Sequence, residues 1–227
     1  FFTAASTVKV PVAMYYYDKI NDGTYTKDSK ILYASGTYEA GGGTTAATYS
    51  VGDSIPLSFL LKQSIVNSDN TAVNILIKNL GYSNCRQDIS EYAEEDLVIP
   101  ESFYSENITS ASYAFDVINH LYENQDSYTD LIEDMKQSSM GIYLKKYITD
   151  YDVAHKYGSY DGYVHDYGIV FGEEPYLIGV FTKGVPDSDE LIANISLDVL
   201  NYTLGKLEVE PLSESQNENT TATETSE

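Results

Sequence analysis

The chain has 227 residues, 42% of them hydrophobic, and a formal net charge of −22 with a sequence pI near 4.2. This is enough apolar material for one compact domain with a buried core, and no apolar run approaches the roughly 20 residues of a membrane span. The acidity and the lack of a basic stripe exclude nucleic acid and anionic lipid as expected partners, because clustered lysine and arginine hold phosphate groups.

Cysteine and histidine are scarce, which limits redox and metal chemistry. The single cysteine, Cys85, excludes an intrachain disulfide and a multi-cysteine metal site. His120, His155 and His165 show no metal-ligand spacing, so we predict neither a metal nor another cofactor.

The first half of the chain predicts helices separated by a poorly patterned segment. Residues 6–20 are typical of a helix, and the Gly- and Thr-rich stretch 31–51, with Gly41-Gly42-Gly43, predicts strands or loop at the surface. Pro56 suits the first turn of a helix that runs through Val66. A further helix from Thr71 is expected to end at Gly81 in a left-handed conformation.

The second half predicts two more helices, a β-meander and a closing helix. The helices span 112–123 and 129–136, and the first has apolar residues at core spacing: Ala114, Val117, Ile118 and Leu121. The predicted antiparallel strands are 153–159, 163–171 and 176–183, followed by a helix over 186–204. The expected fold is α/β, an antiparallel sheet flanked by helices plus an all-helical lobe. Residues 208–227 are rich in Ser, Thr, Asn and Glu, which predicts a disordered acidic tail.

Three short motifs stand in a fixed order: Ser6-Thr7-Val8-Lys9, Ser68-Asp69-Asn70 and Lys156-Tyr157-Gly158. Taken singly, each has an ordinary explanation: a helix start, a polar N-cap turn and a piece of strand. Together they predict chemistry, because a spacing of three places Ser6 and Lys9 on one helical face, where an amine can take the hydroxyl proton. Burial, or the second positive charge of Lys156, would lower the pKa of Lys9 for that task.

These motifs resemble the signature of class A β-lactamases and penicillin-binding proteins. The surrounding segments extend the resemblance over residues 1–207, which we predict to be one β-lactamase-like catalytic domain. Because the family places a helix and strands before the nucleophile, N-terminal elements of the fold are expected to be missing. The resemblance also implies an extracellular or cell-surface protein, and we expect a monomer.

The resemblance implies roles for the matched positions. Ser6 would attack an amide carbonyl, Lys9 would take its proton, and Ser68 would deliver a proton to the leaving nitrogen. Asn70 would orient the substrate and Lys9, while Lys156 would attract a substrate carboxylate. Tyr157, Gly158 and Ser159 would line the substrate, and the backbone N–H groups of Ser6 and Ser159 would form the oxyanion hole. Alternation along the strand turns His155 away from Lys156, which favours packing or a structural hydrogen bond over catalysis.

Two departures from the family pattern bear on turnover. Tyr157 replaces the Thr or Ser whose hydroxyl meets the substrate carboxylate. The stretch 80–109 is short and lacks the Glu-x-x-Leu-Asn loop that carries the deacylating glutamate, so that Glu101 and Glu106 are only weak candidates for this base.

Three functions follow from these observations and stay open at this point. The first is a serine hydrolase that forms and hydrolyses an acyl-enzyme with β-lactams or cell-wall peptides. The second is a penicillin-binding-protein-like D-Ala-D-Ala carboxypeptidase or transpeptidase with slow deacylation, which the missing loop favours. The third is a non-catalytic module that binds the cell wall. The expected partner in each case is a small β-lactam or a peptidoglycan peptide.

Overall fold

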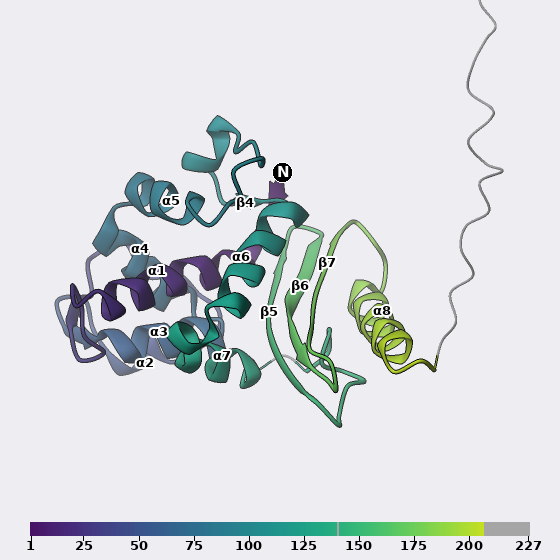
Figure 1. The fold of residues 1–227 in the computed structure, drawn as a ribbon. Helices are drawn as coiled ribbons and strands as arrows, with labels where there is room; N and C mark the ends of the chain where they lie inside the picture. The colour runs from purple at the N-terminus through teal and green to yellow at the C-terminus, as the bar shows by residue number, and fades with distance from the viewer. Residues whose placement is uncertain (140, 207–227) are drawn as a thin grey trace, which may run out of the picture.

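A computed structural model describes residues 1–139 and 141–206 of the chain. A three-stranded sheet stands between a lobe of helices and one C-terminal helix (Figure 1). This is the predicted α/β architecture. The predicted tail, 208–227, lies outside the described residues.

The main sheet is an antiparallel meander of β5 (Asp152–Tyr160), β6 (Tyr163–Phe171) and β7 (Tyr176–Lys183). Its register pairs Lys156 with Tyr167 and Gly158 with His165. Strand β5 is an edge of this sheet, and the third motif, Lys156-Tyr157-Gly158, lies on it. The sequence therefore presents its third motif at the border of the sheet, where another segment can approach.

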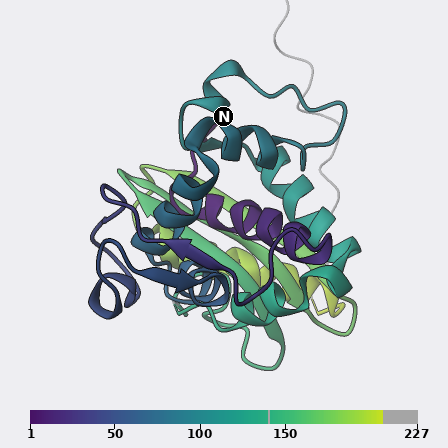
Figure 2. The ribbon, with the colours of Figure 1, turned by 90° about the vertical axis from the view of Figure 1, so that its left-hand side faces the viewer.

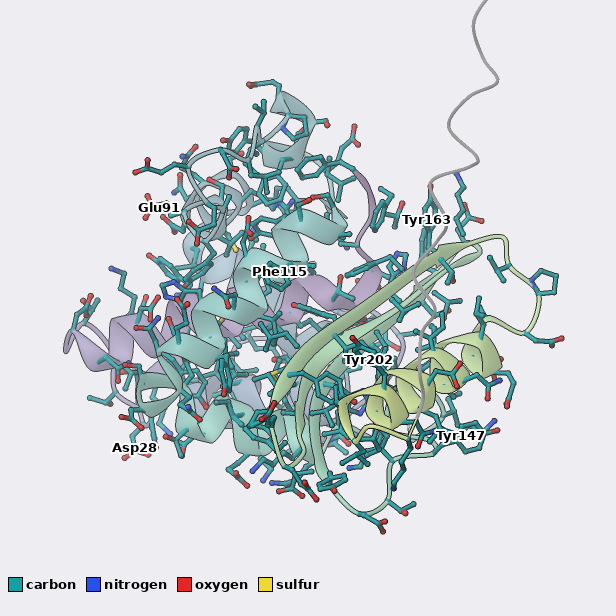
Figure 3. All side chains as sticks on the ribbon, turned by 45° about the vertical axis from the view of Figure 1, so that its right-hand side comes forward. Asp28, Glu91, Phe115, Tyr147, Tyr163 and Tyr202 are labelled. Carbon is teal, nitrogen blue, oxygen red and sulfur yellow. The ribbon has the colours of Figure 1, made fainter. Side chains whose placement is uncertain are left out.

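Helices cover both faces of the sheet. Helix α8 (Ser188–Thr203) packs on one face, while α6 (Ala111–Glu123) and α7 (Thr129–Lys136) pack on the other. Tyr147 lies close to α8 (Figure 3), and its hydroxyl donates to the carboxylate of Glu190 on that helix. Two apolar clusters result, a large one between the sheet and the helical lobe and a smaller one under α8.

The helical lobe carries the first two motifs. Its helices are α1 (Lys9–Asn21), the short α2 (Thr45–Thr48), α3 (Leu57–Val66), α4 (Asn70–Leu80) and α5 (Tyr82–Ser90). Short strand pairs brace it, namely β1 (Phe2–Thr3) with β4 (Ile108–Thr109) and β2 (Lys30–Leu32) with β3 (Ser54–Pro56). Figure 2 shows α1 crossing in front of the sheet, which brings the N-terminal motif to β5.

Most predicted elements are confirmed within a residue or two, and the helix over 129–136 and the strands over 163–171 and 176–183 agree at both ends. The four apolar residues predicted for the core of α6 are buried. Gly81 does have positive φ, but its ψ of 134° is not that of a left-handed helical residue.

Other predictions were wrong in detail. The helix over 6–20 begins as a 3₁₀ turn, Ala5–Val8, before α1, and Pro56 ends a strand one residue before its helix. The pattern did not predict α2, α5 or the strands β1 and β4. These elements are short or mostly polar, so periodicity gives little signal for them and tertiary contacts decide their conformation.

Within residues 1–139 and 141–206, no helix combines the length and the apolar character that a membrane crossing requires. The same residues hold no group of three or more His, Cys, Asp or Glu side chains placed to bind a metal ion.

Candidate active site

Ser6 lies in the 3₁₀ turn that precedes α1, directly against the edge strand β5. A Cβ atom added to Gly158 would come within 2.8 Å of the Ser6 backbone nitrogen and 3.0 Å of the Thr7 nitrogen. Only glycine lets the two backbones approach this closely. Ala5, the residue before the serine, has φ of 49°, a conformation that costs energy in a residue with a side chain. The fold thus holds Ser6 against the strand even though the conformation of Ala5 costs stability.

The amine of Lys9 donates to several groups of the site at once. Its Nζ donates to Ser6 Oγ at 2.9 Å, to Ser68 O at 2.7 Å, to Ser68 Oγ at 3.1 Å and to Asn70 Oδ1 at 2.7 Å. The predicted spacing of Ser6 and Lys9 is therefore realised as a direct hydrogen bond. Residues 59 and 61 positions from Lys9 in the sequence meet at its nitrogen, which joins the first motif to the second.

Burial of the Lys9 amine favours its uncharged form. Lys9 is only 2% exposed, and its desolvation lowers the pKa to about 8, against smaller opposing effects of the Asp69 and Glu39 charges. At neutral pH about a tenth of the protein would then carry the free amine. Of the two expected causes, burial dominates at Lys9, and it is the Lys9 charge that helps to lower the pKa of Lys156.

The second motif forms a strained turn between α3 and α4. Ser68 has φ of 53°, and the Asp69 side chain caps α4 by accepting from the Ala72 backbone nitrogen at 3.0 Å. Asp69 also accepts from the Thr45 backbone nitrogen at 2.9 Å. The turn is thereby tied to α4 on one side and to the start of α2 on the other.

The glycine triplet that looked like an undetermined surface stretch packs on this turn. A Cβ at Gly42 would meet the Asn67 carbonyl oxygen at 2.2 Å, and a Cβ at Gly43 would meet the Asp69 carboxylate at 2.2 Å. Both glycines have positive φ. Sequence reasoning missed this support because nothing local pairs a glycine run with a turn 25 residues later.

Lys156 approaches Ser68 from the sheet. Its fully buried ammonium group donates to Ser68 Oγ at 3.0 Å and to the Tyr157 carbonyl at 2.9 Å. Burial, together with the positive charge of Lys9, lowers the pKa of Lys156 well below its usual value. The Ser68 hydroxyl therefore lies between two amines, an arrangement suited to passing a proton. Binding of a substrate carboxylate by Lys156 remains a prediction.

Tyr157 stands where the family has a small hydroxyl residue, but its side chain makes aromatic contacts. Its ring stacks on Tyr143 with centroids 5.6 Å apart, and the Lys156 Nζ lies 3.9 Å from the Tyr157 ring centroid. A cation over an aromatic face is stabilised by the ring quadrupole. The phenol thus holds Lys156 in place from the side of the smaller apolar cluster.

A cavity of about 430 Å³ opens beside Ser6 and Lys9. None of the three residues of the third motif, Lys156, Tyr157 and Gly158, lines it, but the neighbouring Ser159 does. Apolar and polar side chains share the walls, which comprise Thr3, Ala5, Ser6, Val8, Lys9, Val12, Glu39, Asn70, Val73, Asn74, Ile77, Tyr82, Cys85, Arg86, Asn107, Ser159 and Tyr160. A volume of this size accepts a small organic group together with water.

The two weak candidates for the deacylating base lie elsewhere. Glu101 and Glu106 are exposed and do not line the cavity. Sequence reasoning missed Glu39, which lines it, and Asn74, which follows Asn70 by one helical turn on α4. The spacing of the two asparagines was a usable signal, because residues four apart share a helix face. No local signal points to Glu39.

The His155 side chain lies on the opposite face of β5 from Lys156. Its Nδ1 is hydrogen bonded to Asp166 Oδ2 at 2.8 Å, and both side chains are fully buried. Asp166 also accepts from the Leu144 backbone nitrogen at 3.1 Å. The histidine is therefore a structural partner on the α8 side, as strand alternation predicted.

The family comparison agrees with this geometry. A model of the β-lactamase enzyme family matches residues 1–203, so this chain belongs to that family and is a hydrolase of the β-lactamase fold. No curated protein gives a significant sequence match.

Solved structures show the same fold at low identity. A β-lactamase from Sphaerobacter thermophilus DSM 20745 is similar with a TM-score of 0.77 and 24% identity, over 92% of this chain and 85% of that one. A β-lactamase from Chitinophaga pinensis DSM 2588 gives 0.75 and 22%, over 89% and 86%. A structure of PBP-A gives 0.75 and 21%, over 91% and 82%.

Proposed function

We propose that the protein is a serine hydrolase that forms an acyl-enzyme through Ser6 with the amide of a β-lactam or a related cell-wall peptide. The observation that carries this proposal is the continuous hydrogen-bond chain from Ser6 Oγ through Lys9 Nζ to Ser68 Oγ and Lys156 Nζ. It supplies a nucleophile, a base and a route for the proton in one contiguous group.

The steps follow from the contacts. Lys9, as the free amine, takes the Ser6 proton while Ser6 Oγ attacks the carbonyl carbon. The Ser6 backbone nitrogen, held against Gly158, would donate to the developing oxyanion together with that of Ser159, and one such donor is worth about 3 kcal/mol. The proton then passes through Ser68 to the leaving nitrogen as the amide bond breaks.

Intact-protein mass measured against time after addition of a penicillin tests the proposal. A wild-type adduct that is absent from Ser6→Ala would support Ser6 as the nucleophile. Absence of any adduct, in protein whose folding is checked by circular dichroism, would contradict acyl-enzyme chemistry and favour a non-catalytic module that binds the cell wall.

A second candidate is a carboxypeptidase or transpeptidase of the penicillin-binding-protein type. The position of Glu101 and Glu106 outside the cavity favours it, because an acyl-enzyme without a base for water persists. A stable penicillin adduct, together with release of D-alanine from a D-Ala-D-Ala peptide, would support this candidate. We propose further that the protein acts as a monomer outside the cell or on its surface, where cell-wall substrates occur.

A further inference from the structure

The loop between β2 and α2 contributes a carboxylate, that of Glu39, to the lining of the cavity. Glu39 is clamped to α4 through its backbone, because its nitrogen donates to Thr71 Oγ1 at 3.1 Å and its carbonyl accepts from the same hydroxyl at 3.0 Å. Its side chain is fixed as well, since Oε2 accepts from Asn74 Nδ2 at 2.8 Å. Three contacts with one helix set the position of this carboxylate.

That helix also positions Lys9. Asn70, one turn before Asn74, accepts from Lys9 Nζ through its Oδ1 at 2.7 Å, and its Nδ2 donates to the carbonyl of Ala40, the residue after Glu39, at 3.2 Å. Ser6, Lys9 and Glu39 line the same cavity. Among the described lining residues Glu39 is the one acidic side chain, and its charge is close enough to oppose the lowering of the Lys9 pKa.

The other possible base in the cavity, the Lys9 amine, already has hydrogen-bond partners from the protein. An ammonium group has three protons, whereas Lys9 Nζ has four acceptors within 3.1 Å, each from the protein. Water entering from the cavity therefore meets a carboxylate oxygen more readily than a free amine. The cavity has room for such a water beside an acyl group, since one water needs about 30 Å³.

We propose that Glu39 is the general base that activates water to hydrolyse the acyl-enzyme on Ser6. This inference rests on the proposed function. A Glu39 oxygen takes one proton of the water as the water oxygen bonds to the acyl carbon. The bond from that carbon to Ser6 Oγ then breaks, and the acid product leaves. The proton on Glu39 passes through cavity water and Lys9 to Ser6 Oγ, which restores the Glu39 carboxylate, the free amine of Lys9 and the Ser6 hydroxyl.

The experiment compares acylation and deacylation of wild-type protein, Glu39→Gln and the matched surface control Glu106→Gln. Stopped-flow and intact-protein mass measurements with one penicillin follow formation and decay of the adduct. We expect similar acylation in all three proteins and an adduct that lives about 100-fold longer or more in Glu39→Gln only, the usual size of a lost general base. Asn74→Leu, which frees the carboxylate from its clamp, should slow decay by a smaller factor.

The pH profile separates catalysis from mere support of the fold. Loss of the Glu39 charge should move the midpoint of acylation to lower pH, because that charge raises the Lys9 pKa, whereas Asp69 and Lys156 are unchanged. An adduct of Glu39→Gln that decays as fast as the wild type, or a wild-type adduct that does not decay, would overturn the role of Glu39 while leaving acylation by Ser6 intact. If no protein forms an adduct, the proposed function itself falls.

Discussion

The two faces of strand β5 hold buried ionisable groups in opposite ways. On the face toward the helical lobe, two lysines meet at one serine hydroxyl. On the face toward α8, His155 is hydrogen bonded to a carboxylate, Asp166, which also accepts from a backbone nitrogen. Burial lowers the pKa of the two lysines and favours their free amines, although both donate hydrogen bonds, whereas the contact with Asp166 holds His155 in place. Strand β5 thus carries a residue of the candidate active site, Lys156, on one face and a structural partner of Asp166, His155, on the other.

Strain follows the same division. Ala5 and Ser68, which flank or belong to the reactive network, both have positive φ without being glycine. Two others with this property, Asp161 and Asp187, are at a hairpin turn and at the start of α8, where a left-handed residue is ordinary. Strained residues held by packing are typical of sites that must be ready before substrate arrives.

The largest effect is expected from filling the gap between β5 and Ser6. Gly158→Ala would place a methyl group against the Ser6 and Thr7 backbone nitrogens and move the nucleophile. We expect acylation to fall by about 10²- to 10³-fold, since small misplacements of reacting groups are costly. Acylation rates from stopped-flow are the measurement. Gly172→Ala is the matched control because its Cβ would make only an ordinary contact at 3.6 Å, and equal rates in the two variants would contradict the role of the close approach.

A change on the other face should affect stability instead. Asp166→Ala removes the acceptor of His155 and of the Leu144 nitrogen inside the core, so we expect a loss of about 3 kcal/mol in the free energy of unfolding. Urea denaturation measures this loss, and Asp166→Asn, which keeps a polar partner, should recover part of it. Acylation per folded molecule should stay within about threefold of the wild type. A loss of acylation as large as that of Gly158→Ala would contradict the proposal that only the face of β5 toward the helical lobe takes part in the reaction.

The smallest expected effect is a pH dependence of acylation. The reaction needs the free amine of Lys9, whose pKa burial lowers to about 8. The rate should therefore rise about tenfold per pH unit below pH 8 and level off above it. Single-turnover rates between pH 6 and 9.5 measure the profile. A rate that is flat across this range would show that Lys9 does not take the proton.

The sequence by itself determined the three motifs that meet at the candidate site and the elements that carry them. The order of the three motifs, the spacing of Ser6 and Lys9 and the alternation of His155 against Lys156 are local patterns with a geometric meaning. The three strands of the meander were predicted closely for the same reason, since their residues alternate or run apolar between clear turns.

Only the tertiary structure decided how those residues are supported and what lies beside them. The contact of Gly42 and Gly43 with the Ser68 turn, the stacking of Tyr157 on Tyr143 and the clamp on Glu39 join segments without any shared local pattern. Burial of Lys9 likewise arises from packing of the lobe against the sheet rather than from its neighbours in sequence. A pKa or a cavity is a property of the surroundings in space, and those are set only when the chain closes on itself.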